Sequence, residues 1–418
     1  MKFIADLHIH SHFSRATSRF LDPEHLYLWA KKKGITVLGT GDFTHPGWIS
    51  EIKEKLEETR EGLFRLKPEF KKLTEGQYPA SCKGNPLFLL STEISCIYKK
   101  NGKTRKLHHL LLMPDMKSVL KLNRRLEKMG NISSDGRPIL GLDSRNLLEI
   151  ALETHEKAFL IPAHVWTPWF SLFGSRSGFD TVEECFEDLT GHVHALETGL
   201  SSDPAMNRRL SSLDGYTLVS NSDAHSPNRL GREATLFDTI IDYDHILQAM
   251  TDRKGLAGTI EFFPEEGKYH LDGHRKCGIR LEPAETDELQ GLCPKCHRPL
   301  TIGVLNRIRS LSDRTVSNTD KDFFHLIPLA DILSAVLGCG PGTKKVAICY
   351  DRLIAELGPE LHILLNVPLK KLQAAGGPLF SEAVNRVREK RVVCTGGYDG
   401  QYGTVQIFRE DERKAFLS

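Results

Sequence analysis

The first half of the chain alternates short apolar segments with amphipathic ones, and this alternation restricts the fold more than any other feature. The apolar segments predicted to be buried strands are residues 3–7, 37–39, 87–90, 110–113, 159–161, 195–197 and 217–219. Residues 23–33 and 144–154 have the apolar period of helices lying between strands. Strands and helices in alternation favour a parallel α/β sheet or barrel.

The second half has a different character. After a helix expected at residues 244–253, residues 259–305 are punctuated by glycine, proline and cysteine, and residues 320–391 are mainly helical in pattern. We therefore expect three domains with boundaries at 1–258, 259–310 and 311–418. Within the first domain, residues 46–86 are expected to be a helical insertion, because residues 51–72 are heavily charged with a helical apolar period.

Composition excludes several classes of protein. The 418 residues carry a formal net charge of +2, so nucleic-acid binding would have to depend on local patches. No apolar run approaches the roughly 18 residues of a membrane span, and the N-terminus lacks the pattern of a signal peptide. Six of the nine cysteines are dispersed, as structural thiols in a reducing compartment would be. These features predict a cytoplasmic protein, with no membrane partner.

The segment Asp6-Leu-His8-Ile-His10 is the strongest chemical signal. Residues two apart in a strand share a face, so His8 and His10 can project together and ligate one metal ion. Asp6 lies on the same face, where it can ligate the ion or orient a ring. A single His-x-His also occurs by chance on surface strands.

Further metal-type ligands stand near the ends of the other predicted strands. They are Asp42, Glu93, His109, His164, Asp223 and His225. In a parallel barrel the carboxyl ends of the strands form one face, and active sites lie there. Any one of these residues could be explained by packing alone, but the set predicts a catalytic metal centre.

These residues resemble the motifs of the PHP (polymerase and histidinol phosphatase) superfamily over about residues 1–255. Asp6, His8 and His10 fit its opening motif, Glu93 its glutamate motif, His109 and His164 its middle histidines, and Asp223 and His225 its closing motif. The resemblance implies a distorted (β/α)7-type barrel that holds two divalent ions, Zn or Mg/Mn. It also implies that Glu93 bridges them, with His8, His10 and Asp223 on one ion and His109 and His164 on the other.

Two positions depart from the superfamily pattern. Phe43 and Ala16 stand where histidines of a third metal site are usual, so a third ion stays open unless His12 or His45 substitutes. His108 is expected to point away from the site, on the face of its strand opposite to His109.

Two ions about 3.5–4 Å apart can activate a water and stabilise the leaving oxygen of an in-line displacement. The first domain is therefore predicted to hydrolyse a phosphoester, with Glu93, Asp223 and His225 as catalytic residues. The sequence does not decide whether Asp223 or His225 assists proton transfer.

A cysteine cluster in the second domain predicts a structural zinc site. His274 and Cys277 are followed by Cys293 and Cys296, two ligand pairs separated by fifteen residues, as in a zinc ribbon. A site with four protein ligands has no open position and stabilises the fold. Reduced free thiols are the alternative, and His270 or His297 could replace His274 as the fourth ligand.

Two further segments are candidate nucleic-acid contacts. The turn containing Gly338 and Gly340, followed by Lys344 and Lys345, resembles the hairpin of helix-hairpin-helix modules, and its backbone N–H groups could hold a phosphate. A plain loop is the alternative. Nearby basic residues could extend this surface, although most such runs are solvated faces: Arg307, Arg309, Arg386, Arg388, Lys390 and Arg391.

An aromatic loop follows His164. Trp166, Trp169 and Phe170 could stack on an extruded base, and Arg176 could hold the adjoining phosphate. Packing of the aromatic rings beneath the loop is the alternative.

The whole chain resembles the endonuclease Q branch of the superfamily, DNA-repair nucleases of archaea and some bacteria. The resemblance rests on the opening motifs, the segment 268–277, the Cys-Pro-x-Cys pair and the tail 396–403. It implies cleavage of DNA on the 5′ side of uracil, hypoxanthine, xanthine and abasic sites, with residues 311–418 as a DNA-binding domain. The expected partner is damaged DNA in the nucleoid, the chain is expected to be a monomer, and replication or repair clamps are candidate partners.

Two other functions stay open: a small-molecule phosphatase of the superfamily, and a non-catalytic DNA-binding protein with a decayed centre. The zinc ribbon and basic tail disfavour the first, and the retained ligand set disfavours the second.

Overall fold

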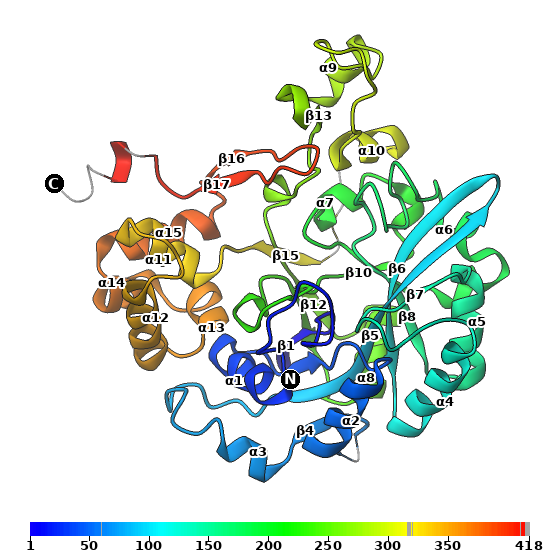
Figure 1. Ribbon diagram of the computed structural model, residues 1–418. Helices are drawn as coiled ribbons and strands as arrows, with labels where there is room; N and C mark the ends of the chain where they lie inside the picture. The colour runs from blue at the N-terminus through cyan, green and yellow to red at the C-terminus, as the bar shows by residue number, and fades with distance from the viewer. Residues whose placement is uncertain (60, 316–318, 320, 410, 414–418) are drawn as a thin grey trace.

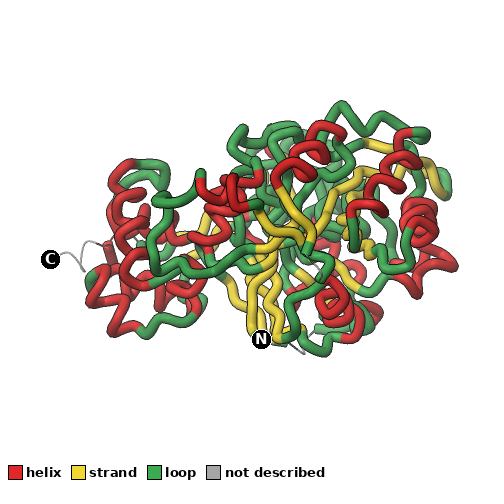
Figure 2. The backbone as a smooth tube through the Cα atoms, turned by 90° about the horizontal axis from the view of Figure 1, so that it is seen from below, coloured by secondary structure: helices red, strands yellow, loops and turns green. Residues whose placement is uncertain are grey.

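The computed structural model describes residues 1–59, 61–315, 319, 321–409 and 411–413. Among them, one mixed sheet of eleven strands organises the molecule. Its main path is β15 (Asp322–His325), β12 (Leu256–Glu261), β11 (Ala234–Asp238), β1 (Lys2–Asp6), β2 (Val37–Gly39), β5 (Leu87–Lys100), β4 (Phe64–Leu66) and β3 (Leu56–Glu58). From β5 the sheet branches: β6 (Lys103–Met113) and β7 (Ile139–Leu140) both pair with β5, and β8 (Phe159–Pro162) pairs with β6. Figure 2 shows the strands at the centre with helices on both sides.

A short parallel pair, β9 (Ala195–Glu197) and β10 (Thr217–Val219), closes the ring between β8 and β11. On one side the Val165 amide donates to the Glu197 carbonyl at 3.1 Å. On the other side the Ser220 amide donates to Thr235 Oγ1 at 3.0 Å, and this hydroxyl donates back to the Ser220 carbonyl at 2.9 Å. The result is the distorted barrel that the sequence predicted.

The barrel interior is a compact apolar core. Its strand residues alternate along each strand, as period-2 pleating requires: Phe3, Ala5, Leu7, Val37, Leu89, Leu110, Leu112, Phe159, Ile161, Ala195, Val219 and Phe237. Helix α8 (Tyr243–Asp252) packs Tyr243, Ile246 and Met250 into the same core and closes one end. The opposite end, where β1 and β2 finish, is left for polar groups.

Helices cover the outside of the barrel. They are α1 (Pro23–Lys33), α2 (Pro46–Lys55), α3 (Pro68–Lys72), α4 (Met116–Glu127), α5 (Ser144–Thr154), α6 (Val182–Phe186) and α7 (Pro204–Asn207). Short 3-10 helices complete the connections: η1 (Glu187–His192), η2 (Ser211–Leu213), η3 (Pro227–Arg229), η4 (Pro264–Glu266) and η5 (Arg275–Cys277). In α1, Asp22 accepts the His25 amide at the N-cap and Gly34 ends the helix at φ 86°, as expected for Asp and Gly at these positions.

Two parts of the barrel differ from the expected pattern. β5 and β6 form a long antiparallel hairpin around Asn101-Gly102, so the sheet is mixed and not parallel throughout. The insertion at 46–86 is only partly helical, because β3 and β4 pair between α2 and α3. Leu56, Phe64 and Leu66 are buried, and covering these side chains against the barrel favours a hairpin over a continuous solvated helix.

Residues 262–311, here named the zinc module, follow β12 and project from the barrel (Figure 1). Its elements are β13 (Asp272–His274), β14 (Ile279–Leu281), α9 (Pro283–Glu288) and α10 (Val304–Leu311). The C-terminal region is mainly helical, with α11 (Leu329–Leu337), α12 (Lys344–Leu357), α13 (Glu360–Leu365), α14 (Leu369–Gly376), α15 (Pro378–Arg388) and the hairpin β16 (Val393–Thr395) and β17 (Thr404–Gln406). No helix in the described residues is long and apolar enough to cross a membrane.

The C-terminal helices are fastened to the barrel. β15 pairs in parallel with β12, and a buried ion pair joins Lys33 of α1 to Glu360 of α13 at 2.8 Å. Glu360 also accepts hydrogen bonds from the Tyr350 hydroxyl at 2.8 Å and the Leu329 amide at 3.0 Å. With all its partners in place the buried charge is compensated, and α11–α13 are held in one orientation.

Candidate metal centre

Histidines and carboxylates from four segments converge at the open end of the barrel. His8 and His10 follow β1, Glu93 lies in β5, His164 follows β8, and Asp223 follows β10. His164 and Asp223 have φ of 31° and 46°. Such backbone strain in non-glycine residues is concentrated at functional sites. Close packing fits this geometry, since a Cβ on Gly199 would lie 2.4 Å from the His164 Cβ.

One group of donors consists of His8, His10, Glu93 and Asp223, whose ligand atoms lie within 4.8 Å of one another. His10 Nε2 is 3.0 Å from Asp223 Oδ1 and 3.3 Å from Glu93 Oε2. His8 Nε2 is 3.5 Å from the same Glu93 oxygen. The sequence placed these four residues around one ion, and the structure brings them together.

The second group consists of Glu93, His108 and His164. His108 Nδ1 lies 2.7 Å and His164 Nε2 lies 3.2 Å from Glu93 Oε1. The two oxygens of Glu93 therefore face different groups, Oε2 toward the first and Oε1 toward the second. A carboxylate in this position can bridge two cations.

The choice of His109 over His108 was wrong. Glu93 pairs with Leu110 across the β5–β6 hairpin, and directly opposed residues of an antiparallel pair share a face. Residues two apart also share a face, so His108 lies with Glu93 and His109 faces the helices. There His109 is fully buried, and its Nε2 lies 2.8 Å from Ser144 Oγ.

Two buried carboxylates orient the first pair of histidines. Glu197, at the end of β9, has both oxygens 3.0 Å from His8 Nδ1, and Asp42 Oδ1 lies 3.1 Å from His10 Nδ1. Carboxylates hold metal-binding imidazoles in this way and direct the other ring nitrogen to the metal. Glu197 was not predicted as a site residue, although its position as the last residue of a predicted strand matches that of the other donors.

The donor set fits divalent cations. His8 Nε2 is buried and has no hydrogen-bond partner, while Nδ1 of the same ring is held by Glu197. Burial by itself would lower the pKa of His8, but the Glu197 and Glu93 carboxylates outweigh it and raise this pKa well above its usual value. A site so rich in anions, with an unpaired nitrogen pointing into it, is suited to bind metal cations through N and O ligands.

Groups around this centre shape its chemistry further. Arg137 Nη1 lies 3.0 Å from Glu93 Oε2, a contact that the sequence did not predict. His225 Nδ1 donates to the Asp223 carbonyl at 2.9 Å. In the neutral ring Nε2 therefore carries no proton and can accept one. Burial lowers the pKa of His225, so its neutral form is favoured.

Neither alternative donor for a third ion points toward this centre. His12 Nε2 lies 3.0 Å from Glu51 Oε1. His45 caps α2 by accepting the Gly47 amide at its Nδ1, and its Nε2 contacts the Ser133 carbonyl at 3.0 Å. Both rings are engaged elsewhere in this conformation.

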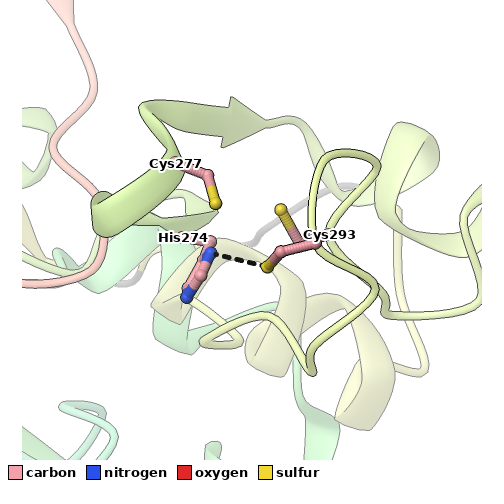
Figure 3. A group of neighbouring side chains, drawn as sticks. His274, Cys277 and Cys293 are labelled. Atoms are coloured by element: carbon pink, nitrogen blue, oxygen red, sulfur yellow. Dashed lines mark hydrogen bonds between the residues drawn. The ribbon is translucent and has the colours of Figure 1, made fainter.

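The zinc module carries a second donor cluster, shown in Figure 3. His274, Cys277, Cys293 and Cys296 place their ligand atoms within 4.8 Å of one another. Cys296 Sγ lies 3.4 Å from His274 Nδ1. The four predicted ligands converge as a zinc ribbon requires, and His274 takes the position for which His270 and His297 were alternatives.

The aromatic loop is used differently from the prediction. Trp166 is buried and its indole N–H donates to Asn207 Oδ1 at 2.7 Å, so it is a core residue. Phe170 is half-buried and packs on the His108 ring at 4.7 Å between centroids. Arg176 Nη2 donates to the Leu300 carbonyl of the zinc module at 2.8 Å. Of the three predicted aromatic contacts, only Trp169 is exposed, with 36% of its surface accessible.

The glycine turn joins α11 to α12, as predicted. Gly338 ends α11 at φ 67°, and Thr343 caps α12 by accepting the Val346 amide. Gly340, Lys344 and Lys345 are exposed. Most of the other basic residues have protein partners instead: Arg307 with Asp180, Arg309 with Asp287, Arg386 with Glu412, Arg388 with the Leu364 carbonyl, and Arg391 with Glu389.

A cavity of about 1440 Å³ opens at the metal centre. His164, Asp223 and His225 line it on the barrel side, and Tyr269, Asp331 and Tyr402 line it from the zinc module, α11 and the β16–β17 hairpin. The site therefore opens into a space walled by all three parts of the chain.

Comparison with known proteins gives matches along the chain. Residues 328–391 match the family described as the MJ0043 C-terminal domain. The protein MJ0043 of Methanocaldococcus jannaschii, whose function is not assigned, is 32% identical over 254 residues. This match covers 58% of the present chain but only 31% of that relative. YqxK of Bacillus subtilis, also without an assigned function, is 28% identical over 97% of this chain and 99% of its own.

Two solved structures resemble the whole chain. One is the lesion-specific endonuclease PfuEndoQ of Pyrococcus furiosus, with a TM-score of 0.84 and 29% identity over 98% of this chain and 96% of that one. The other is an endonuclease Q in complex with a 27-mer duplex that has an abasic lesion at the active site, with a TM-score of 0.84 and 29% identity over 99% of this chain and 98% of that one. The resemblance expected from the sequence is thus confirmed: the chain is similar to endonuclease Q in fold along nearly its whole length.

Proposed function

We propose that the chain is a metal-dependent DNA endonuclease of repair. It hydrolyses the phosphodiester on the 5′ side of deaminated bases, namely uracil, hypoxanthine and xanthine, and at abasic sites. The observation that carries the proposal is the position of Glu93, whose two oxygens face two separate donor groups at the mouth of a large cavity. The related endonuclease Q complex, with an abasic lesion at its active site, supports DNA as the substrate.

The two donor groups support a proposed set of metal ligands. His8, His10, Glu93 and Asp223 would hold one divalent ion, and Glu93, His108 and His164 the other. Such a pair, Zn or Mg/Mn, supplies Lewis acidity and an activated water for in-line displacement at phosphorus. Glu197 and Asp42 contact Nδ1 of His8 and His10, which directs Nε2 of both rings toward the proposed metal site.

The chain's own groups then handle protons. His225 Nδ1–H is fixed by the Asp223 carbonyl, so Nε2 is the nitrogen that can accept a proton from the attacking water. The neutral ring favoured by burial suits a group that first accepts a proton and then returns it to the leaving oxygen. Arg232 hydrogen-bonds the Ser222 and Asp223 carbonyls at 2.8 and 3.3 Å and supports this loop.

The size of the cavity favours a polymeric substrate over a small phosphate monoester. It extends from the metal centre over the zinc module and the C-terminal helices, farther than a small-molecule phosphatase requires. The complete donor groups disfavour a decayed, non-catalytic centre. Trp169 and the turn with Gly338, Gly340, Lys344 and Lys345 are the proposed DNA contacts outside the centre, through stacking and through backbone N–H groups and lysines.

The test uses end-labelled duplexes that differ only at one nucleotide: deoxyuridine, deoxyinosine, deoxyxanthosine, an abasic site or an undamaged base. Each is incubated with the protein and Mg²⁺, Mn²⁺ or Zn²⁺. The proposal predicts a nick immediately 5′ of the lesion and none in the undamaged duplex. Absence of lesion-dependent nicking with every metal would refute it. Monomeric state and binding to replication or repair clamps remain predictions for sizing and pull-down experiments.

A further inference from the structure

Three aromatic side chains line the cavity or pack against a residue that lines it. Tyr402, on the loop of the β16–β17 hairpin, is 72% exposed, and Trp169 is 36% exposed. Tyr269 packs against Trp169 with ring centroids 5.6 Å apart at 68°. Tyr269 and Tyr402 line the same cavity as His164, Asp223 and His225. We name Trp169, Tyr269 and Tyr402 the aromatic rim.

An exposed tyrosine gains little from apolar burial, so the position of Tyr402 suggests that its ring contacts a ligand. Lys268 Nζ lies 4.6 Å from the centre of the Tyr402 ring, which adds a cation beside the aromatic face. A flat ring with an adjacent ammonium matches a nucleotide, whose base stacks on the ring while its phosphate approaches the cation.

The zinc module contacts both loops that carry the exposed rings of the aromatic rim. The first is the loop that carries Trp169. On the Trp169 side, Ser175 Oγ donates to the Ile302 carbonyl at 3.0 Å. Arg307 of α10 donates to the Phe173 carbonyl at 2.9 Å and the Phe179 carbonyl at 3.1 Å. These contacts fix both ends of the segment that follows Trp169.

The zinc module also holds the β16–β17 loop, which carries Tyr402. Asp399, in the loop that carries Tyr402, accepts the Arg275 amide at 2.6 Å and the Thr301 hydroxyl at 2.7 Å. The Leu271 amide donates to the Gly397 carbonyl at 2.8 Å. Figure 1 shows the hairpin reaching from the C-terminal helices to the base of the zinc module, beside β13.

We propose that the aromatic rim stacks on the bases that flank the extruded nucleotide, and that the zinc module sets the position of the rim. The proposal rests on the proposed function, because it assumes a DNA substrate with a nucleotide drawn toward the metals. Extrusion leaves neighbouring bases without a stacking partner, and aromatic rings replace that partner. The zinc site thereby serves substrate recognition, in addition to fold stability, without contacting the reacting phosphate.

The experiment measures binding and not cleavage. A duplex with a stable abasic analogue carries 2-aminopurine next to the lesion, and its fluorescence is titrated with protein in buffer without added divalent metal. Stacking of Tyr402 should quench the 2-aminopurine. Tyr402→Ala should weaken binding by about tenfold and remove the quenching, whereas Tyr402→Phe should retain both. Leu73→Ala removes an apolar side chain that is 62% exposed and lies outside the cavity, and it should bind like the wild type.

Thr301→Val tests the positioning role of the zinc module, because it deletes the hydroxyl that donates to Asp399 and keeps the side-chain shape. It should weaken binding severalfold, and the effect should vanish when Tyr402 is already alanine, as expected when one residue acts through another. The control is Thr190→Val, which deletes a hydroxyl that donates to the Glu187 carbonyl and does not line the cavity. It should have no effect on binding.

The outcomes separate the two proposals. Wild-type binding and quenching in Tyr402→Ala would overturn the stacking role. Equal losses for Thr301→Val with and without Tyr402 would overturn the positioning role. A wild-type protein that binds and quenches but never nicks any damaged duplex would refute the nuclease proposal and leave the rim supported. A wild-type protein with no preference for the abasic duplex would refute both.

Discussion

Replacing Glu197 by glutamine should weaken divalent-metal binding at the barrel mouth by about 10- to 100-fold, the usual effect of losing a carboxylate that orients a metal-binding histidine. Glu197 does not belong to either donor group. It is nevertheless in contact with a residue of each, because its oxygens lie 3.0 Å from His8 Nδ1 and its Oε2 accepts the His164 amide at 2.9 Å.

The magnitude follows from counting donors. Glu197 is buried and faces three of them: His8 Nδ1, the His164 amide and Asn221 Nδ2, the last at 2.9 Å. Glutamine offers one acceptor oxygen, and its NH₂ group must face at least one of these donors. A buried donor without an acceptor costs about 1–3 kcal/mol. Since about 1.4 kcal/mol is a factor of ten, this cost corresponds to roughly 5- to 150-fold in the metal dissociation constant, a range that contains the 10- to 100-fold given above.

The assay is a titration of metal-depleted catalytic sites with Mn²⁺, with free Mn²⁺ measured by electron paramagnetic resonance. Glu183→Gln is the matched control, because Glu183 is an exposed acid in the first turn of α6. We expect wild-type affinity for the control and weak binding for Glu197→Gln. An unchanged dissociation constant in Glu197→Gln would refute the orienting role of this carboxylate.

Three further predictions follow from the same geometry. His108→Ala should lower metal affinity by at least about 100-fold, whereas His109→Ala should leave metal affinity near wild type and reduce the free energy of unfolding by about 2–4 kcal/mol; the same Mn²⁺ titration and urea denaturation distinguish them, and the reverse pattern would restore His109 as the ligand. Cys293→Ser should release about one zinc equivalent per chain and lower the melting temperature, so an unchanged zinc content would contradict the ribbon. Burial raises the pKa of Glu261 well above its usual value, so its protonated form is favoured in the fold and stability is lost as pH rises from about 4.5. Glu261→Gln should therefore stabilise the protein more at pH 8 than at pH 5, and equal effects on urea unfolding at both pH values would contradict this.

The sequence predicted much of the barrel because its signals are local. Residues 23–33 and 144–154 are helical within the same bounds in the structure, since Asp22 and Asp143 cap them as side-chain acceptors. Short buried strands such as Val37–Gly39 were also found residue for residue. Their neighbours are glycines and polar residues that end an apolar run sharply.

The sequence pattern did not predict how the strands pair. The choice of His109 over His108 was wrong because it required the register of β5 and β6. The apolar ends of β5 and β6 were recognised, but the charged middle and the Asn101-Gly102 turn were not joined into one hairpin, although Asn-Gly is a strong hairpin signal. The face on which a histidine lies depends on strand register, and a shift of one residue reverses it. Neighbouring histidines can therefore be assigned only once the pairing is known.

Side-chain exposure was the other limit. Trp166 and Trp169 are three residues apart in one loop, yet one is buried against Asn207 and the other is exposed. Arg176 looked free for a phosphate but is bonded to the zinc module. Tyr402 was not singled out, because only tertiary contacts bring the end of the chain to the cavity.

The central claim is that the centre around Glu93 cleaves DNA beside a lesion, and one paired measurement tests it directly. Wild type and Asp223→Ala are compared on the same labelled abasic duplex, with nicking and the dissociation constant recorded in parallel. We predict that the wild type nicks the strand 5′ of the lesion. Asp223→Ala should bind with similar affinity and nick at the background rate, because Asp223 is proposed as a metal ligand and not as a DNA contact. Substantial nicking by Asp223→Ala, or none by the metal-loaded wild type, would contradict the claim.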